Sequence, residues 1–122
     1  MTLVDTSVWI EHLRAPCREL VELLEQGQVL GHPFVLGELA CGSLRNRQEV
    51  LENVELLPAA TLATHDEVMT TVELHSLYGR GLGWVDVHLL SSALVSKADL
   101  WTFDRPLRSA WAHVRSRMPA DG

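Results

Sequence analysis

The segment LVDTSVWI, residues 3–10, predicts a strand that turns directly into a helix. Thr2–Asp5 has the apolar character and the length of a short buried strand, and good helix-capping residues follow it near Ser7. The helix itself is marked by apolar residues at helical spacing: Trp9, Ile10 and Leu13. Asp5 therefore lies at the carboxyl end of a strand, which is where open α/β sheets bind their ligands.

Strands and helices alternate along the rest of the chain. Further short strands are expected at Gln28–Gly31 and Leu100–Asp104. Helices are expected at 18–25, 33–44, 47–56, 64–78, 84–96 and 105–114, and Thr64 with Glu67 forms a capping-box pattern at the start of the fourth of these. Strands joined by helices pair in parallel, so the sequence predicts an α/β fold: a mostly parallel central sheet flanked by helices.

Length and composition indicate one globular domain over residues 1–122, with the tail from residue 116 onward frayed. No segment approaches the roughly 20 apolar residues that a membrane helix needs, and the N-terminus carries no basic region typical of a signal peptide. The two cysteines, Cys17 and Cys41, have no metal-binding or redox spacing, so we expect reduced thiols packed as small apolar residues. These features predict a cytoplasmic protein that does not enter the membrane.

The formal net charge of −6 argues against a protein that grips nucleic acid over its whole surface, because phosphate affinity depends on cations. It does not exclude a nuclease, because the excess acid can lie in one site that a metal neutralises. The basic residues are nine arginines and Lys97. Arginine suits bidentate contact with phosphate better than lysine does.

Four acidic residues stand out from the solvated acids of the helix surfaces. Asp104 follows an apolar strand just as Asp5 does, so the two aspartates are expected at the same edge of the sheet. Asp86 shares a helix face with apolar residues three, four and seven positions later. Glu38 is the one charge in the apolar segment PFVLGELACGSL, residues 33–44. For each aspartate the alternative is an ordinary helix N-cap.

Four carboxylates in one cleft repel each other strongly, and the arginines lie elsewhere in the sequence, so a divalent cation is the simplest compensation. Oxygen ligands alone favour magnesium or manganese over zinc or copper. The six histidines show no HxxxH or HExxH spacing, which also argues against zinc. Asp99 is excluded because, at about 3.3 Å per strand residue, it belongs to the opposite edge of the sheet from Asp104.

Four blocks of the sequence together are similar to the PIN domain, specifically to VapC-type toxins of bacterial toxin–antitoxin pairs. They are LVDTSVWI, PFVLGELACGSL, GLGWVDVHLLSSAL (residues 81–94) and LWTFDRPL (residues 100–107). The similarity covers essentially the whole chain in the right order. It implies a Rossmann-like sheet with an acidic pocket, and a magnesium- or manganese-dependent endoribonuclease.

The resemblance places the family's catalytic and metal-binding acids on four positions of this chain: Asp5, Glu38, Asp86 and Asp104. Thr6 and Thr102 occupy hydroxyl positions beside the site, where they are expected to hold carboxylates or water in place. The resemblance also implies a cognate antitoxin that blocks the pocket, a self-associated (homodimeric) toxin, and an RNA substrate whose cleavage inhibits growth.

Position in the sequence makes Arg105 and Arg108, just after Asp104, candidates for RNA phosphate contacts, with solvent-exposed helix charge as the alternative. A partner is also expected because the chain has more apolar surface than a small domain easily hides, although core burial accounts for part of it. That surface comprises Trp9, Leu13, Leu20, Leu23, Leu24 and the 34–44 helix.

Three other functions fit the sequence less well. A haloacid-type phosphatase needs a second acid two residues after its nucleophilic aspartate, where this chain has Ser7. A phosphoaspartate signal receiver needs a lysine at a strand end, which Lys97 is not. A non-catalytic interaction module is expected to have apolar or basic residues in place of the four acids.

Overall fold

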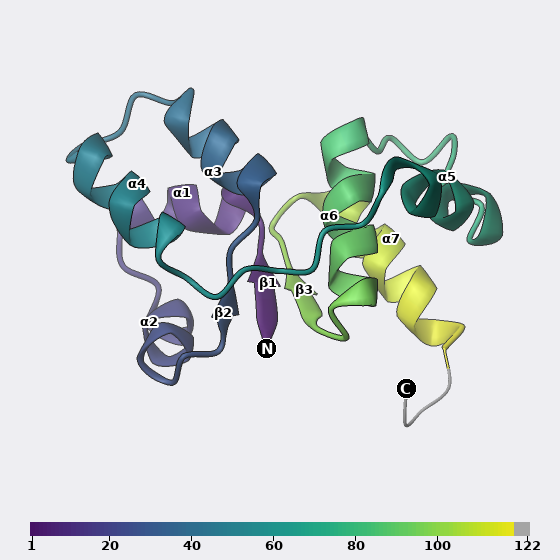
Figure 1. Ribbon diagram of the computed structural model, residues 1–122, viewed down its shortest axis with the longest axis horizontal. Coiled ribbons are helices and arrows are strands. Elements are labelled where there is room, and N and C mark those ends of the chain that lie inside the picture. Colours follow the sequence, from purple (N-terminus) through teal and green to yellow (C-terminus); the bar gives the residue numbers. More distant parts are fainter. Residues whose placement is uncertain (119–122) are drawn as a thin grey trace.

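The computed structural model describes residues 1–118, in which three strands alternate with seven helices (Figure 1). The strands are β1 (Thr2–Val4), β2 (Val29–Leu30) and β3 (Asp99–Trp101). The helices are α1 (Thr6–Arg14), α2 (Arg18–Glu25), α3 (Pro33–Ala40), α4 (Arg47–Glu55), α5 (His65–Leu74), α6 (Trp84–Val95) and α7 (Arg105–Ser116). Within these residues no helix is long and apolar enough to cross a membrane.

The sheet has the order β2-β1-β3, and both pairings are parallel. The register pairs Leu3 with Leu30 on one side and with Leu100 on the other, so that the carboxyl ends of the strands face the same way. A single parallel bridge between Gly31 and Ala59 extends the β2 edge. The predicted α/β fold with a parallel central sheet is confirmed.

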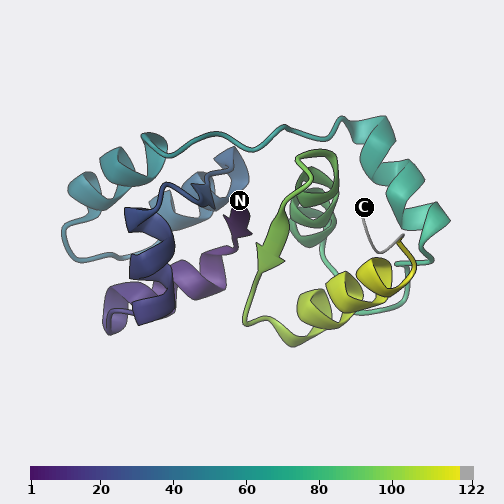
Figure 2. The same ribbon diagram turned by 90° about the horizontal axis from the view of Figure 1, so that it is seen from below.

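The helices flank the sheet in two groups. Helices α1–α4 lie on the β2 side and α5–α7 on the β3 side, and the extended segment between α4 and α5 passes from one group to the other (Figures 1 and 2). Helix α6 packs directly against β1 and β3, and it also contacts α5 and α7. This arrangement places the start of α6 beside the carboxyl ends of the two strands.

Several elements are shorter than the sequence predicts. β1 and β3 end at Val4 and Trp101, before the aspartates, because Asp5 and Asp104 are already the N-caps of α1 and α7. Helix α3 ends at Ala40 because the Arg47 guanidinium donates to the Ala40 carbonyl at 2.9 and 3.1 Å and thereby caps the helix.

Helix α5 begins with the predicted capping box but ends early. The Glu67 amide donates to Thr64 Oγ1 at 3.1 Å, and the Thr64 amide donates to the Glu67 carboxylate at 2.8 Å. The helix ends at Leu74 instead of Tyr78, because Ser76 adopts a left-handed φ of 52° that stops the helical path. At the other end of the chain, Ser116 still belongs to α7, and residues 119–122 of the expected frayed tail lie outside the described residues.

The core is aliphatic and centres on β1 and α6. Leu3, Val4, Leu89 and Leu90 are completely buried. Leu20 and Trp9, which were counted among the surplus apolar residues, belong to this core. Cys17 and Cys41 are free thiols as expected, but Cys41 is exposed because α3 ends just before it, so its predicted packing is wrong.

A buried polar chain links the two helix groups through His32. The imidazole Nδ1 of His32 accepts the Phe34 amide at 3.0 Å and so caps α3, which leaves the proton on Nε2, 3.1 Å from Ser92 Oγ in α6. Ser92 Oγ also accepts the Ala63 amide at 3.3 Å. Because His32 and Ser92 are 5% and 0% exposed, burial, with His88 nearby, lowers the pKa of His32 to about 4.

The low pKa of His32 predicts that acid destabilises the protein. The unfolded chain takes up a proton on this imidazole near its ordinary pKa of about 6.5, whereas the folded chain resists protonation until about pH 4. Stability is therefore lost as the pH falls from about 6.5 towards 4. Between pH 7 and 4.5 the wild type should lose on the order of 2 kcal/mol more unfolding free energy than His32→Asn, which keeps a capping oxygen but does not titrate. Urea denaturation at both pH values measures this difference, and equal losses would contradict it.

Candidate active site

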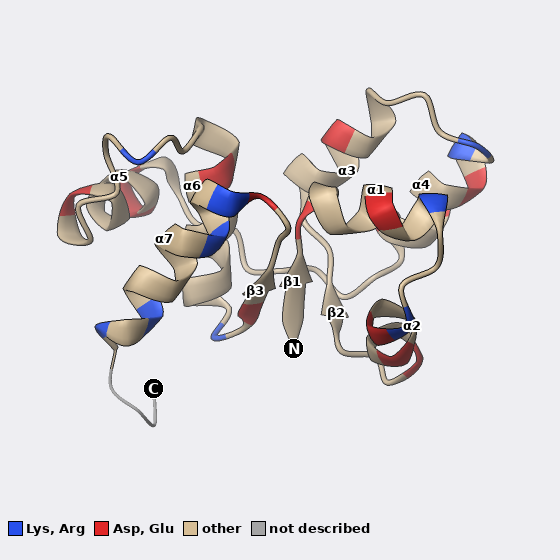
Figure 3. Ribbon diagram, turned by 180° about the vertical axis from the view of Figure 1, so that it is seen from behind, with Lys and Arg blue, Asp and Glu red and all other residues tan. Residues whose placement is uncertain are grey.

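The four acidic residues singled out in the sequence come from four different elements. Asp5 directly follows β1, and Asp104 ends the short loop between β3 and α7. Asp86 lies in the first turn of α6, and Glu38 lies in α3. Figure 3 shows acidic segments on all four of these elements at the same end of the sheet. All four residues thus lie on elements that meet at the carboxyl edge of the sheet.

Asp5 is buried and held by hydroxyl groups. The carboxylate Oδ2 accepts hydrogen bonds from Ser7 Oγ and Thr102 Oγ1, both at 2.7 Å. Asp5 is only 6% exposed. The same hydroxyls accept amide hydrogens from the loop after β3: Asp104 donates to Thr102 and Phe103 donates to Ser7, both at 3.0 Å. These bonds join the ends of β1 and β3 and fix the Asp5 carboxylate between them.

Asp86 and Asp104 both cap helices, and their carboxylates also lie near one another. Asp86 Oδ2 accepts the Gly83 amide at 2.8 Å, and Asp104 Oδ2 accepts the Leu107 amide at 3.0 Å. The capping alternative is thus real for both residues. Burial raises the pKa of Asp86, and the negative charges of Asp104 and Asp5 raise it further, against the opposing effect of the Gly83 amide. Capping alone does not explain why three carboxylates are close enough to influence one another.

Glu38 has a partner on the neighbouring helix. Its Oε1 accepts a hydrogen bond from Thr6 Oγ1 at 2.6 Å, which joins α3 to the start of α1. The helix buries Val35 and Leu39 but leaves Glu38 exposed, so the apolar surroundings of this segment did not indicate a buried carboxylate. The short hydroxyl contact nevertheless orients the glutamate next to Asp5, the neighbour of Thr6 in the chain.

Each carboxylate uses only one of its two oxygens in hydrogen bonds within residues 1–118. The engaged atoms are Oδ2 of the three aspartates and Oε1 of Glu38. The ion pairs in this part of the chain involve other acids: Glu11, Glu22 and Asp99. Arginine pairing therefore does not neutralise the cluster, and one oxygen of each carboxylate is left for another partner.

The spacing of the carboxylates is looser than that of a closed metal site. In residues 1–118 no three histidine, cysteine or acidic side chains lie close enough together to hold an ion as they stand. The mutual influence of Asp5, Asp86 and Asp104 on the pKa of Asp86 is compatible with this, since charges interact over longer distances than the 2.0–2.6 Å of oxygen coordination. The donor chemistry fits magnesium or manganese, because every available atom is a carboxylate oxygen.

Arg105 and Arg108 occupy the first turns of α7, immediately after Asp104, and both are exposed. Figure 3 shows the basic segments at the start of α7 beside the acidic start of α6. Among the described residues neither arginine takes part in an ion pair. Both guanidinium groups are therefore accessible to a ligand that reaches the carboxylates.

Ser7 is the contact that sequence reasoning missed. It was read only as part of the helix start, yet it is one of the two hydroxyls on Asp5. The signal that was available is a hydroxyl residue two positions after a strand-terminal aspartate. The partner loop after β3 is distant in sequence, so the pairing itself becomes visible only in the fold.

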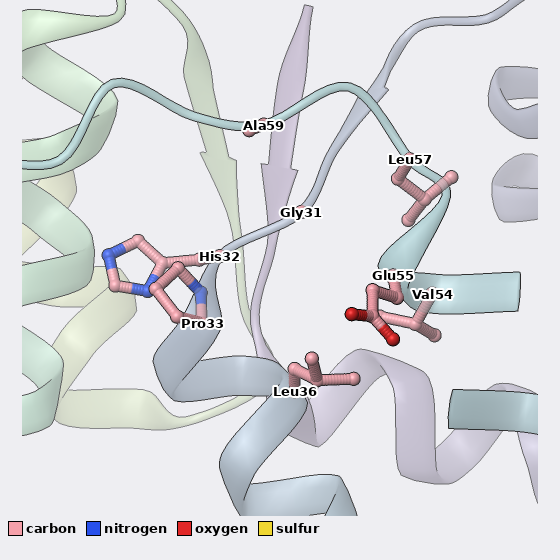
Figure 4. A pocket seen from close by; sticks show the side chains of 8 residues that line it. All are labelled: Gly31, His32, Pro33, Leu36, Val54, Glu55, Leu57 and Ala59. Atoms are coloured by element: carbon pink, nitrogen blue, oxygen red, sulfur yellow. The ribbon is translucent and has the colours of Figure 1, made fainter. Parts of the chain in front are cut away.

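A pocket of about 180 Å³ lies apart from the carboxylates, between β2, α3 and α4. Apolar side chains of Leu36, Val54 and Leu57 line it, and the His32 ring points away from them (Figure 4). None of the four clustered carboxylates contributes to its wall. It offers no chemistry comparable with that of the sheet edge.

Comparisons with known proteins place the chain in a family. A family model described as PIN domain matches residues 2–110. The chain is 52% identical over 113 residues to proteins named Ribonuclease VapC32 from two strains of Mycobacterium tuberculosis, CDC 1551 / Oshkosh and ATCC 25618 / H37Rv. Each match covers 92% of this chain and 91% of the relative.

The hydroxyl clamp on Asp5 predicts a specific stability loss. Thr102→Val removes a donor to the buried Asp5 carboxylate and leaves the Asp104 amide without its acceptor, so the unfolding free energy should fall by about 1–3 kcal/mol. Thr71→Val is the matched control, because the Thr71 hydroxyl donates only to a helix carbonyl at an exposed position. Chemical denaturation of both variants measures the contrast, and equal losses would show that the clamp does not hold the site together.

Proposed function

The chain belongs to the PIN-domain family, and within it to the VapC type, and on that premise we propose that it is a metal-dependent endoribonuclease. In this proposal it cleaves RNA as the growth-inhibiting toxin of a toxin–antitoxin pair, and the PIN domain extends over residues 1–122. The observation that carries the proposal is that Asp5 and Asp104 lie close enough to Asp86 for their charges to act on it, while Thr6, the residue after Asp5, holds Glu38 by a hydrogen bond. Within residues 1–118, each of the four carboxylates keeps one oxygen free of protein hydrogen bonds. The ribonuclease names of the relatives support it.

Asp5, Glu38, Asp86 and Asp104 would hold Mg²⁺ or Mn²⁺ in this proposal. When bound, such an ion activates water for attack on the phosphodiester and stabilises the charge that develops on the phosphorus oxygens. Thr102 and Ser7 keep the Asp5 carboxylate fixed, and Thr6 keeps Glu38 in place. These hydroxyl partners matter because mutating a residue that holds a metal ligand in place typically lowers metal affinity or activity by about 10–100-fold.

Arg105 and Arg108 are proposed to contact RNA phosphate groups next to the scissile bond. Both guanidinium groups are exposed and lie in the helix that Asp104 caps. Their planar donor arrays suit bidentate phosphate contacts, and their position compensates for the negative charge that RNA meets at the carboxylates. This explains how a protein with a net charge of −6 attracts a polyanion locally.

We further propose that an antitoxin neutralises the protein, that the toxin forms a homodimer, and that both act in the cytoplasm. A groove of about 270 Å³ between α1, α2 and α4 offers an apolar docking site for an antitoxin segment. Its lining includes Leu13 and Leu24, which are not part of the fully buried core. These are two of the apolar residues whose number first indicated a partner.

The carboxylate cluster is tested by Asp86→Asn, which removes one charge at constant shape. We expect metal-dependent RNA cleavage to fall at least about 100-fold, because metal catalysis supplies several kcal/mol of transition-state stabilisation. The fold should remain, since an asparagine oxygen can still accept the Gly83 amide. Asp99→Asn is the matched control, as Asp99 is exposed and lies 3.9 Å from Arg115 at the start of β3. Full activity of Asp86→Asn in a fluorogenic RNA assay would eliminate the proposed site.

Metal binding is tested separately from activity by thermal unfolding. An ion that binds only the assembled carboxylates stabilises the fold by about 2.7 kcal/mol at 100 times its Kd, which corresponds to a Tm increase on the order of 5–10 °C. Wild type and Asp99→Asn should show this shift with millimolar Mg²⁺ or Mn²⁺, and Asp86→Asn should show less. If the wild-type Tm is the same with the metal and with a chelator, these carboxylates do not form a metal site.

A further inference from the structure

Five aromatic rings from three parts of the chain form a continuous row, here called the ring row. Its members, in spatial order, are His32, Phe34, His88, Trp84 and His65. Successive ring centroids are 5.1, 4.8, 4.6 and 5.3 Å apart. The rings come from the start of α3, from α6 and from the start of α5, so the row bridges helices that are distant in sequence.

The ring row rises from the core to the surface. His32 is 5% exposed, whereas Phe34 is 36% and Trp84 is 44% exposed. Only the inner end has an evident role in the fold, because His32 caps α3 and bonds to Ser92. The outer rings meet edge to face, at 63° and 85° for the two contacts of His88. Phe34, Trp84 and His65 are exposed and His88 is half-buried, so core packing does not account for the outer part of the row.

The ring row shares two helices with the carboxylates. Phe34 precedes Glu38 by four residues in α3, so the two side chains share a helix face about 6 Å apart along the axis. Asp86 lies in the first turn of α6, two residues from both Trp84 and His88, and therefore on a different side of that helix from the rings. Both helices that carry an exposed ring of the row therefore also carry a carboxylate of the proposed active site.

We propose that the ring row is a subsite on which bases of single-stranded RNA stack while the neighbouring phosphate reaches the carboxylates. The proposal rests on the RNA-cleaving function proposed above and extends it to the recognition of unpaired bases. Phenylalanine, tryptophan and histidine are the side chains on which splayed-out RNA bases stack. Each such contact contributes about 1–3 kcal/mol and tolerates different bases, because every base has an aromatic face.

Base stacking provides RNA affinity that does not depend on positive charge. The chain has ten basic residues against sixteen acidic ones, so few cations are available to hold RNA. A base on the ring row adds affinity without adding charge. A protein surface covering Phe34 would have to remove water from the Glu38 carboxylate on the same helix face without a compensating charge, which is unfavourable. The surroundings therefore favour a nucleotide over a second protein.

The test compares Trp84→Leu and Trp84→Phe with Trp111→Leu. Trp111 is the matched control, because it packs against Arg115 in α7, outside the ring row. Binding of a fluorescently labelled oligouridine is measured by anisotropy with a chelator present, so that no cleavage occurs. Trp84→Leu should raise Kd about 5- to 150-fold, the equivalent of about 1–3 kcal/mol, at both low and high salt. Trp84→Phe should restore binding, and Trp111→Leu should leave it unchanged.

Three results would overturn the proposal. One is wild-type affinity in Trp84→Leu, and another is an equal loss in Trp111→Leu. The third is a Trp84→Leu protein that dissociates from dimer to monomer in sedimentation, with a loss of RNA affinity no larger than the loss of dimer explains. That result would make the ring row an interface between copies. Cleavage of RNA by the wild type with Mg²⁺ or Mn²⁺, together with unchanged binding by Trp84→Leu, rejects the ring row alone. A wild type that neither binds nor cleaves RNA rejects the proposed function as well.

Discussion

The buried carboxylate of Asp5, held between the hydroxyls of Ser7 and Thr102, is the contact on which the rest of the site depends. Burying a carboxylate costs several kcal/mol unless hydrogen bonds or a cation compensate for it. Here one hydroxyl comes from the first turn of α1 and the other from the residue after β3, and each also accepts an amide from the loop that leads to α7. The same bonds that make burial of Asp5 tolerable therefore position the second aspartate. Parallel pairing of β1 and β3 is required for this, because only then do both strands end at the same edge.

Repulsion within the cluster explains why the carboxylates come together without closing on one another. Asp86 carries the clearest sign of it, since burial and the charges of Asp104 and Asp5 all favour its protonated form. The backbone amides of Gly83 and Leu107 each bond to one oxygen, Oδ2, of Asp86 and Asp104, and leave the other oxygen without an amide partner. The capping hydrogen bonds therefore also serve the cluster, because they hold the Asp86 and Asp104 carboxylates in place although their charges repel each other. A surface selected only for stability would not retain such an arrangement.

The sequence predicted the order of the elements and the position of Asp5 at the end of a strand well, because those signals are local. A charged residue at the end of an apolar strand, such as Asp5, or on an apolar helix face, such as Asp86, is visible from its immediate neighbours. The exposure of Glu38 was not predictable in this way, since it depends on how α3 meets α1. The early end of α3 depends on Arg47, seven residues beyond the carbonyl that it caps. The expectation of a packed thiol at Cys41 failed for the same reason.

Contacts between distant segments account for the remaining features, and they also bear on how an acidic protein handles RNA. The sequence indicates no role for His88, because the six histidines show no metal-binding spacing. The crossing of α3 and α6 brings it within 4.8 Å of the Phe34 ring and makes it the middle of a row. A site built from carboxylates has to repel phosphate groups, so its affinity for RNA must come from elsewhere. In the proposed function, the aromatic rings would supply affinity for RNA without adding charge, whereas additional arginines would pair with the carboxylates and neutralise them. A shortage of cations together with exposed rings is what such a site requires, because its carboxylates have to stay free.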